Sequence, residues 1–139
     1  MKKENVVDRE SAEAEFDRFA ECMDLDINTT RMDPEDATAF NKTKDRLIKA
    51  VQQGSLVFNE DGEAVYTPSH PKSKHDKPIT FHERTGASLM AMDSKKKGHD
   101  VAKTYAVLAN MCEVHPSTFA NLVGIDVKIC EAIFALLMD

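Results

Sequence analysis

The chain has 139 residues, of which 42% are apolar and 30% charged, and its net charge is −6 at pH 7. This length fits one domain, or one domain with an attached arm, and the apolar share is enough for a modest core. Because no apolar run could span a bilayer and the first residues lack the apolar segment of a secretory signal, we expect neither membrane insertion nor export.

Acidic residues are concentrated near the N-terminus. Residues 1–40 hold five basic and twelve acidic side chains, a net charge of −7, whereas residues 41–139 carry a net charge of +1. Such an acidic segment repels nucleic-acid phosphates, and it also fits a solvated helix face. Three widely spaced cysteines without a Cys-x-x-Cys pair indicate reduced thiols and a cytoplasmic protein.

The first predicted helix covers residues 11–24, with Ser11 as its N-cap. Apolar side chains recur there at the spacing of one helix face: Phe16, Phe19, Ala20 and Met23. Residues 1–10 lack an apolar face, so we expect them to be mobile.

The second predicted helix has the clearest start signal in the chain. Asp33 can cap it, and Pro34 suits the first helical position because its missing N–H leaves no bond unmade. Gly54 is suited to end it in the left-handed conformation. Its apolar stripe consists of Phe40, Leu47, Ile48 and Val51. We therefore divide the chain into an acidic helical arm, residues 1–54, and a module of residues 55–139, which together form one compact domain.

The spacing of apolar residues then changes from helical to alternating. Two short β-prone runs flank the turn 59–62, where Gly62 can adopt positive φ, and they predict a hairpin. After a polar loop, residues 79–82 read as a third strand. A small antiparallel sheet of about three strands is expected.

The C-terminal part predicts several short helices. A helix over 87–93 is followed by a basic break, then by a longer helix capped by Asp100, and then by the segment 117–123. Asp126 is expected to cap the last helix, which carries a wide apolar face. The predicted fold is α+β and mainly helical: a hairpin or three-stranded antiparallel sheet flanked by N-terminal helices and a C-terminal helical bundle.

Residues that carry out chemistry do not converge in the sequence. The five histidines form no metal-ligand spacing, Cys112 and Cys130 lie among apolar helical residues, and no glycine-rich phosphate loop occurs. We therefore predict a binding protein rather than an enzyme, with no cofactor and no metal.

A partner surface is predicted instead, because the last helix has more apolar residues than one core-facing side needs and methionine adapts to several partners. Six residues are expected to contribute to it: Met90, Met92, Ile129, Ile133, Phe134 and Leu137.

DNA binding is the alternative. Residues 116–134 resemble a helix-turn-helix, with Ala120 and Gly124 at the spacing that such a turn needs. The recognition helix would begin at Asp126 and offers one Lys, two acids and no Arg, Asn or Gln in its first turns to read base edges. With the net charge of −6, we expect no nucleic-acid partner; a small acidic transcription regulator stays the alternative.

The order of the segments resembles the tail assembly chaperones of long-tailed bacteriophages. A hairpin is followed by a strand with a Thr-Gly turn, by a helix, and by a patterned run before the last helix. That run is carried here by Leu108, Ala109, Val114, Pro116, Phe119, Leu122 and Asp126, and the resemblance covers roughly residues 55–139.

This resemblance implies a function in tail morphogenesis. Such chaperones bind the long, helical tape measure protein before the tail tube polymerises around it, help to recruit tail tube subunits, and are absent from the finished virion. It implies action in the host cell cytoplasm, with no cofactor. A Met- and Phe-rich apolar face is compatible with binding an amphipathic helix and with self-association into a homo-oligomer.

Overall fold

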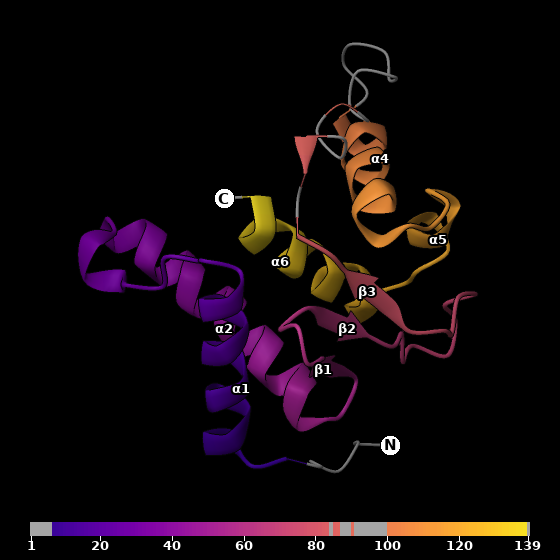
Figure 1. The fold of residues 1–139 in the computed structure, drawn as a ribbon. Helices are drawn as coiled ribbons and strands as arrows, with labels where there is room; N and C mark the ends of the chain where they lie inside the picture. Colours follow the sequence, from indigo (N-terminus) through magenta and orange to yellow (C-terminus); the bar gives the residue numbers. More distant parts are fainter. Residues whose placement is uncertain (1–6, 84, 87–89, 91–99, 139) are drawn as a thin grey trace.

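A computed structural model of the chain describes residues 7–83, 85–86, 90 and 100–138 (Figure 1). The fold is α+β and mainly helical, with a three-stranded antiparallel sheet, as predicted. Its elements, in chain order, are α1 (Arg9–Cys22), the 3-10 turn η1 (Thr29–Arg31), α2 (Pro34–Gln52), β1 (Leu56–Phe58), β2 (Ala64–Tyr66), β3 (Ile79–Phe81), α4 (Asp100–Cys112), α5 (Ser117–Ala120) and α6 (Ile125–Met138).

The first two helices begin and end at local signals. Helix α2 starts with Pro34 after Asp33, and Gly54 follows its end with φ of 82°, as predicted, but the Asp33 side chain makes no capping hydrogen bond. The predicted Ser11 cap of α1 is wrong, because the helix starts two residues earlier. Asp8 is the N-cap, and its carboxylate accepts a hydrogen bond of 2.7 Å from the backbone N–H of Ser11.

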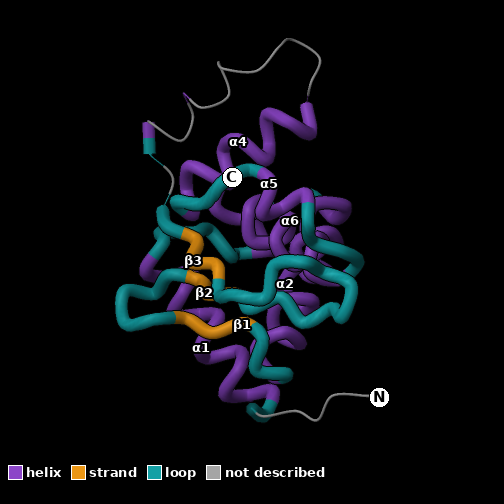
Figure 2. Tube along the Cα trace, turned by 90° about the vertical axis from the view of Figure 1, so that its right-hand side faces the viewer, coloured by secondary structure: helices purple, strands orange, loops and turns teal. Residues whose placement is uncertain are grey.

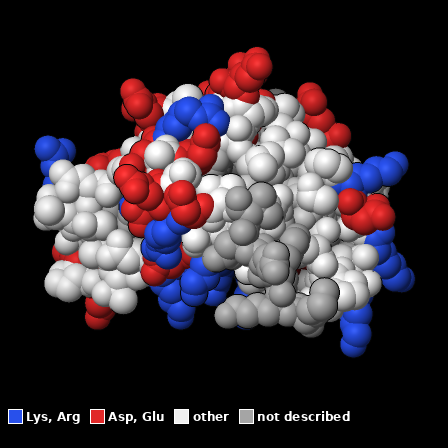
Figure 3. Space-filling view, turned by 90° about the horizontal axis from the view of Figure 1, so that it is seen from below, with Lys and Arg blue, Asp and Glu red and all other residues white. Residues whose placement is uncertain are grey.

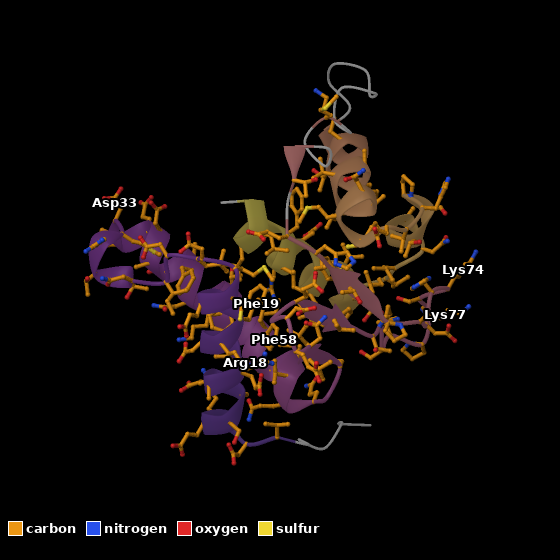
Figure 4. All side chains as sticks on the ribbon, in the orientation of Figure 1. Arg18, Phe19, Asp33, Phe58, Lys74 and Lys77 are labelled. Carbon is orange, nitrogen blue, oxygen red and sulfur yellow. The ribbon has the colours of Figure 1, made fainter. Side chains whose placement is uncertain are left out.

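Helix α1 is docked on the rest of the protein by its predicted apolar face. The side chains of Phe16 and Phe19 are fully buried, and the ring of Phe19 stacks on Phe58 with centroids 4.8 Å apart. The guanidinium of Arg18 donates hydrogen bonds of 2.8 Å to the carbonyl oxygens of Phe58 and Asn59. Figure 4 shows these three labelled side chains, Arg18, Phe19 and Phe58, gathered where α1 meets β1.

The sheet has the order β1-β2-β3, with both pairs antiparallel. In the β1–β2 turn, the side-chain oxygen of Asn59 accepts from the N–H groups of Asp61 and Glu63, and Gly62 has φ of 79°. One face of the sheet packs into the core. Its buried side chains are Leu56, Phe58, Ala64, Tyr66, Ile79 and Phe81. Figure 2 shows α1 at the β1 end of this sheet and α4 at the β3 end.

Helix α6 crosses the middle of the molecule, between the α1–α2 pair and the α4–α5 pair (Figure 1). Buried side chains from all the helices except η1, and from all three strands, form one hydrophobic core. The segment 117–123 is helical only over Ser117–Ala120. The helix predicted over 87–93 lies outside the described residues, except for Met90.

Asp126 is not the cap that the sequence predicts, because α6 starts at Ile125 and Asp126 already lies in the first helical turn. The carboxylate is completely buried and accepts four hydrogen bonds, one from the last residue of β2 and three from the segment that follows it. The donors are the Tyr66 hydroxyl (2.5 Å), the Ser69 N–H (2.9 Å), the His70 N–H (3.0 Å) and the Ser73 hydroxyl (2.6 Å).

This set of bonds joins the long loop after β2 to the start of α6. The Ser73 hydroxyl oxygen also accepts from the N–H of Val123, and the N–H of Lys74 donates to Asn121. Burial alone would raise the pKa of Asp126, but the bonds from Ser73, Tyr66 and the two backbone N–H groups outweigh burial and hold the pKa below its usual value. The buried group is therefore an ionised carboxylate at neutral pH.

Candidate functional site

The six predicted partner residues do not share one surface among the described residues. Ile129, Ile133 and Leu137 are buried in the core, with exposed fractions of 2%, 0% and 5%. Phe134 is partly buried against that core, and Met90 is 71% exposed. Met92 lies outside the described residues. The structure therefore gives the aliphatic members of this set a packing role and leaves Met90 open to solvent.

An apolar groove lies instead where the N-terminal half of α2 meets the C-terminal end of α6. It consists of two depressions of about 360 and 290 Å³, both of which are lined by Phe40 and Leu136. We call it the Phe40 groove. Its other described lining residues are Asp24, Leu25, Asp26, Met32, Asp36, Ala39, Thr43 and Ala135.

The charge around the Phe40 groove has one sign. Asp24, Asp26 and Asp36 are the charged residues among those described in its lining, and all three are acidic. The groove therefore combines an apolar floor with an acidic rim. That combination suits an amphipathic helix whose apolar face is flanked by Lys or Arg.

The segment between α1 and α2 shapes one wall of this groove. After α1 ends, Asp24 takes a positive φ of 54°, and the N–H of Leu25 donates to the carbonyl of Ala20 at 2.8 Å. The chain thereby turns back beside α2, where Asn28 accepts hydrogen bonds from the N–H and hydroxyl of Thr30. Aspartate tolerates this left-handed conformation better than most residues do.

Sequence reasoning missed this groove because three separate segments build it. The sequence pattern places Phe40 on the apolar stripe of α2, and Leu25 and Met32 lie between the two predicted helices, where no pattern predicts a structure. A usable signal was the position of Phe40, which stands alone in the first half of α2, seven residues before the cluster that begins at Leu47.

A second hollow, of about 690 Å³, lies between β3 and the turn from α4 to α5. A histidine–carboxylate pair borders it: His82 Nδ1 lies 2.5 Å from Glu63 Oε2, and His82 Nε2 lies 3.7 Å from Glu113 Oε2. Burial raises the pKa of Glu63, but hydrogen bonds from Asn59 and His82 outweigh it and lower the pKa overall. Glu113 has a positive φ of 56°.

The His82–Glu63 pair does not activate either buried cysteine as a nucleophile. Burial raises the pKa of Cys112 to about 12, and burial also raises the pKa of Cys130, so both thiols are protonated at neutral pH. A protonated, buried thiol is neither a good nucleophile nor a good metal ligand. Over residues 7–83 and 100–138, no three His, Cys, Asp or Glu side chains are grouped to hold a metal ion.

The predicted recognition helix of the DNA-binding alternative is largely buried. Among residues 125–137 of α6 the exposed positions are Ile125, Lys128, Glu131 and Ala135, and in the first turn Asp126 is buried under the segment that bonds to it. No helix within the described part of the chain combines the length and apolar character needed to cross a membrane. Comparisons of the chain with protein-family models, with curated proteins and with solved structures found no match.

Proposed function

We propose that this protein is a tail assembly chaperone of a long-tailed bacteriophage, which binds an amphipathic helix of the tape measure protein in the Phe40 groove. The observation that carries the proposal is the groove itself, an open apolar floor between α2 and α6 with an acidic rim. A helix can place side chains at i, i+3 or i+4 and i+7 into such a floor while its polar side stays in water.

The chemistry of the groove supports binding without turnover. Its described lining contains aliphatic, aromatic, threonine and aspartate side chains, but no histidine, lysine or cysteine. One short groove gives a weak contact, and many copies bound along one long client would gain strength through multivalency. In this proposal the protein acts in the host cell cytoplasm, recruits tail tube subunits and needs no cofactor, and self-association into a homo-oligomer is compatible with it.

The DNA-binding alternative has less support. A recognition helix must present the side chains of its first turns to a groove of DNA, whereas Asp126 at the start of α6 is completely buried. In a low-salt gel-shift experiment we expect no sequence-dependent complex. A submicromolar, sequence-dependent shift would favour the regulator instead.

The proposal is tested by filling the groove without touching the core. Ala39 and Ala135 line it and are exposed, so Ala39→Arg and Ala135→Arg add bulk there at little cost in stability. The matched control is Asn41→Arg, which adds an arginine at an exposed site of the same helix that is not part of the lining.

The assay is co-expression with the tape measure protein of the same phage, followed by measurement of its soluble yield and its co-purification. The groove variants should lose the client while their circular dichroism stays native, and Asn41→Arg should retain it. If the groove variants retain the client as well as the wild type does, the groove is not the binding site.

A further inference from the structure

The other end of the α2–α6 contact carries the opposite charge. Lys42, Arg46 and Lys49 recur at i, i+4 and i+7, so they lie on one side of α2. They line a pocket of about 410 Å³ together with Ile125 and Ile129 from the start of α6. We call it the Arg46 pocket.

The positive charge of this pocket is not neutralised by the described neighbours. None of the three cations has an ion-pair partner within the described ranges 7–83 and 100–138. One carboxylate, that of Asp45, also lines the pocket, but it accepts a hydrogen bond of 2.6 Å from Arg9. The chain has a net charge of −6, and Figure 3 shows basic side chains interspersed with acidic ones on one face of the molecule.

The floor of the pocket is apolar, and its polar groups are already used. Ile125 is 44% exposed there. The Tyr66 hydroxyl and the Ser69 N–H both donate to Asp126. The four donors around Asp126 also compensate its charge, so that buried carboxylate opposes an incoming anion less than a bare one would. The pocket therefore offers a ligand three basic side chains without an ion-pair partner among the described residues, together with an exposed isoleucine.

We infer that the Arg46 pocket is a docking site for an acidic peptide segment of a partner protein. An apolar side chain of that segment covers Ile125, and flanking Glu or Asp carboxylates pair with Lys42, Arg46 and Lys49. The three basic side chains favour a partner with acidic groups. The exposed isoleucine favours a peptide over inorganic phosphate, because a peptide can also cover an apolar side chain. Stacking on bases needs an exposed aromatic ring, but Tyr66, the aromatic residue in the described lining, is 1% exposed.

The inference is independent of the proposed function. The Phe40 groove is acidic and takes a basic amphipathic helix, whereas the Arg46 pocket is basic and lies at the other end of α2. A protein with both sites could hold two different partners, or two parts of one partner, at the same time.

The probe is a fluorescein-labelled peptide of alternating Glu and Leu, with a Gln-for-Glu peptide as the uncharged control, followed by fluorescence anisotropy at low salt. The Glu peptide should bind and the Gln peptide should not. Binding should weaken as salt is added, because exposed ion pairs are screened.

Two charge-reversed variants locate the binding site. Lys42→Glu with Lys49→Glu, both exposed positions, should weaken binding by at least about tenfold. Lys74→Glu with Lys77→Glu makes the same charge change at two exposed residues outside the pocket lining, labelled in Figure 4, and should change binding by less than about twofold. Arg46→Gln provides a milder second test at the pocket, and circular dichroism verifies that each variant is folded.

Three results would overturn the inference. They are equal binding of the Gln peptide, equal loss in the Lys74/Lys77 variant, and no binding of the Glu peptide at millimolar concentration. Tighter binding of single-stranded DNA or inorganic phosphate than of the Glu peptide, lost in the Lys42/Lys49 variant, would make the pocket a phosphate site instead. Ala135→Arg, which fills the Phe40 groove, should leave peptide binding unchanged, so the failure of either site is recognised separately.

Discussion

The side chain of Asp126 joins two segments that are more than fifty residues apart in the sequence. Its partners include two backbone N–H groups, which no substitution in the loop other than proline would remove. A carboxylate can accept from four donors at once, whereas an amide in its place brings its own donors against theirs. The charge at this position is therefore required by the geometry around it.

We predict that Asp126→Asn lowers the free energy of unfolding by about 1–3 kcal/mol at pH 7, because it leaves buried donors unpaired. The folded-state pKa of Asp126 is lowered, so its stabilisation is complete above the unfolded-state value and is lost as the pH falls through the folded-state value. Urea unfolding of the wild type and Asp126→Asn at a series of pH values measures how the difference in their free energies of unfolding depends on pH. The difference between wild type and variant should narrow below about pH 4.

Tyr66→Phe is the control for this prediction. It removes one of the four donors and leaves the carboxylate charged, so its cost should be smaller, about 0.5–1.5 kcal/mol. If Asp126→Asn is as stable as the wild type at pH 7, the four hydrogen bonds do not contribute net stability.

The sequence correctly places Asp126 at the start of the last helix, but it does not predict that the side chain binds the segment after β2. Aspartate beside a helix start is usually a cap, and nothing near residue 126 signals donors from residues 66–73. The same limit applies to the Glu63–His82 pair, whose members are 19 residues apart and on different strands or strand ends. Contacts between distant segments follow from the fold, which local patterns do not contain.

At the scale of elements, the β1–β2 turn requires glycine at position 62, both for its backbone conformation and for its close contact with the end of α1. Gly62 has φ of 79°, and a Cβ atom added there would lie 2.4 Å from Cys22 Cβ and 2.6 Å from its sulfur. Conformation and contact with α1 therefore both require glycine.

We predict that Gly62→Ala lowers the free energy of unfolding by about 1–3 kcal/mol or more, from backbone strain and from displacement of the end of α1. Gly86→Ala is the matched control, since an added Cβ there meets nothing within 4 Å, and it should change stability far less. Urea unfolding of the two variants gives the comparison. Equal stability of Gly62→Ala and wild type would show that the turn and α1 adjust without cost.

The elements with strong local signals were the ones that the sequence predicted well. Asp33 with Pro34 marks the start of α2, and the alternation around the turn 59–62 marks the hairpin. For the last helix, the sequence predicts part core and part partner surface, because the helix is apolar on several sides. Its surroundings decide the outcome: α2 packs against it, which buries Ile129 and Ile133.

At the scale of the whole molecule, residues 1–54 and 55–139 contribute to the same core. Phe16 and Phe19 from the first segment are packed with Leu56 and Phe58 from the second. A shared core of this kind favours one cooperative unfolding transition rather than separate loss of an arm.

We predict that Phe16→Ala and Phe19→Ala each lower the free energy of unfolding by about 3–5 kcal/mol, because each leaves a buried cavity. Far-UV circular dichroism and tyrosine fluorescence should report the same shifted midpoint in urea. Val57→Ala truncates a side chain that is 52% exposed and should cost much less. Early loss of helix, followed by an unshifted second transition, would mean that α1 unfolds independently of the rest.

The contact between Arg18 and β1 has a further consequence for how copies of this chain behave together. Strand β1 is one of the two outer strands of the sheet, and the guanidinium donates to the carbonyl oxygens of Phe58 and Asn59 at its end. If α1 detaches, those carbonyls and the Phe58 ring become free together, and an unpaired strand with an apolar side chain is a template for another chain. By covering this edge, helix α1 protects the strand from pairing with another chain, so we expect variants that weaken the docking of α1 to self-associate more readily than the wild type.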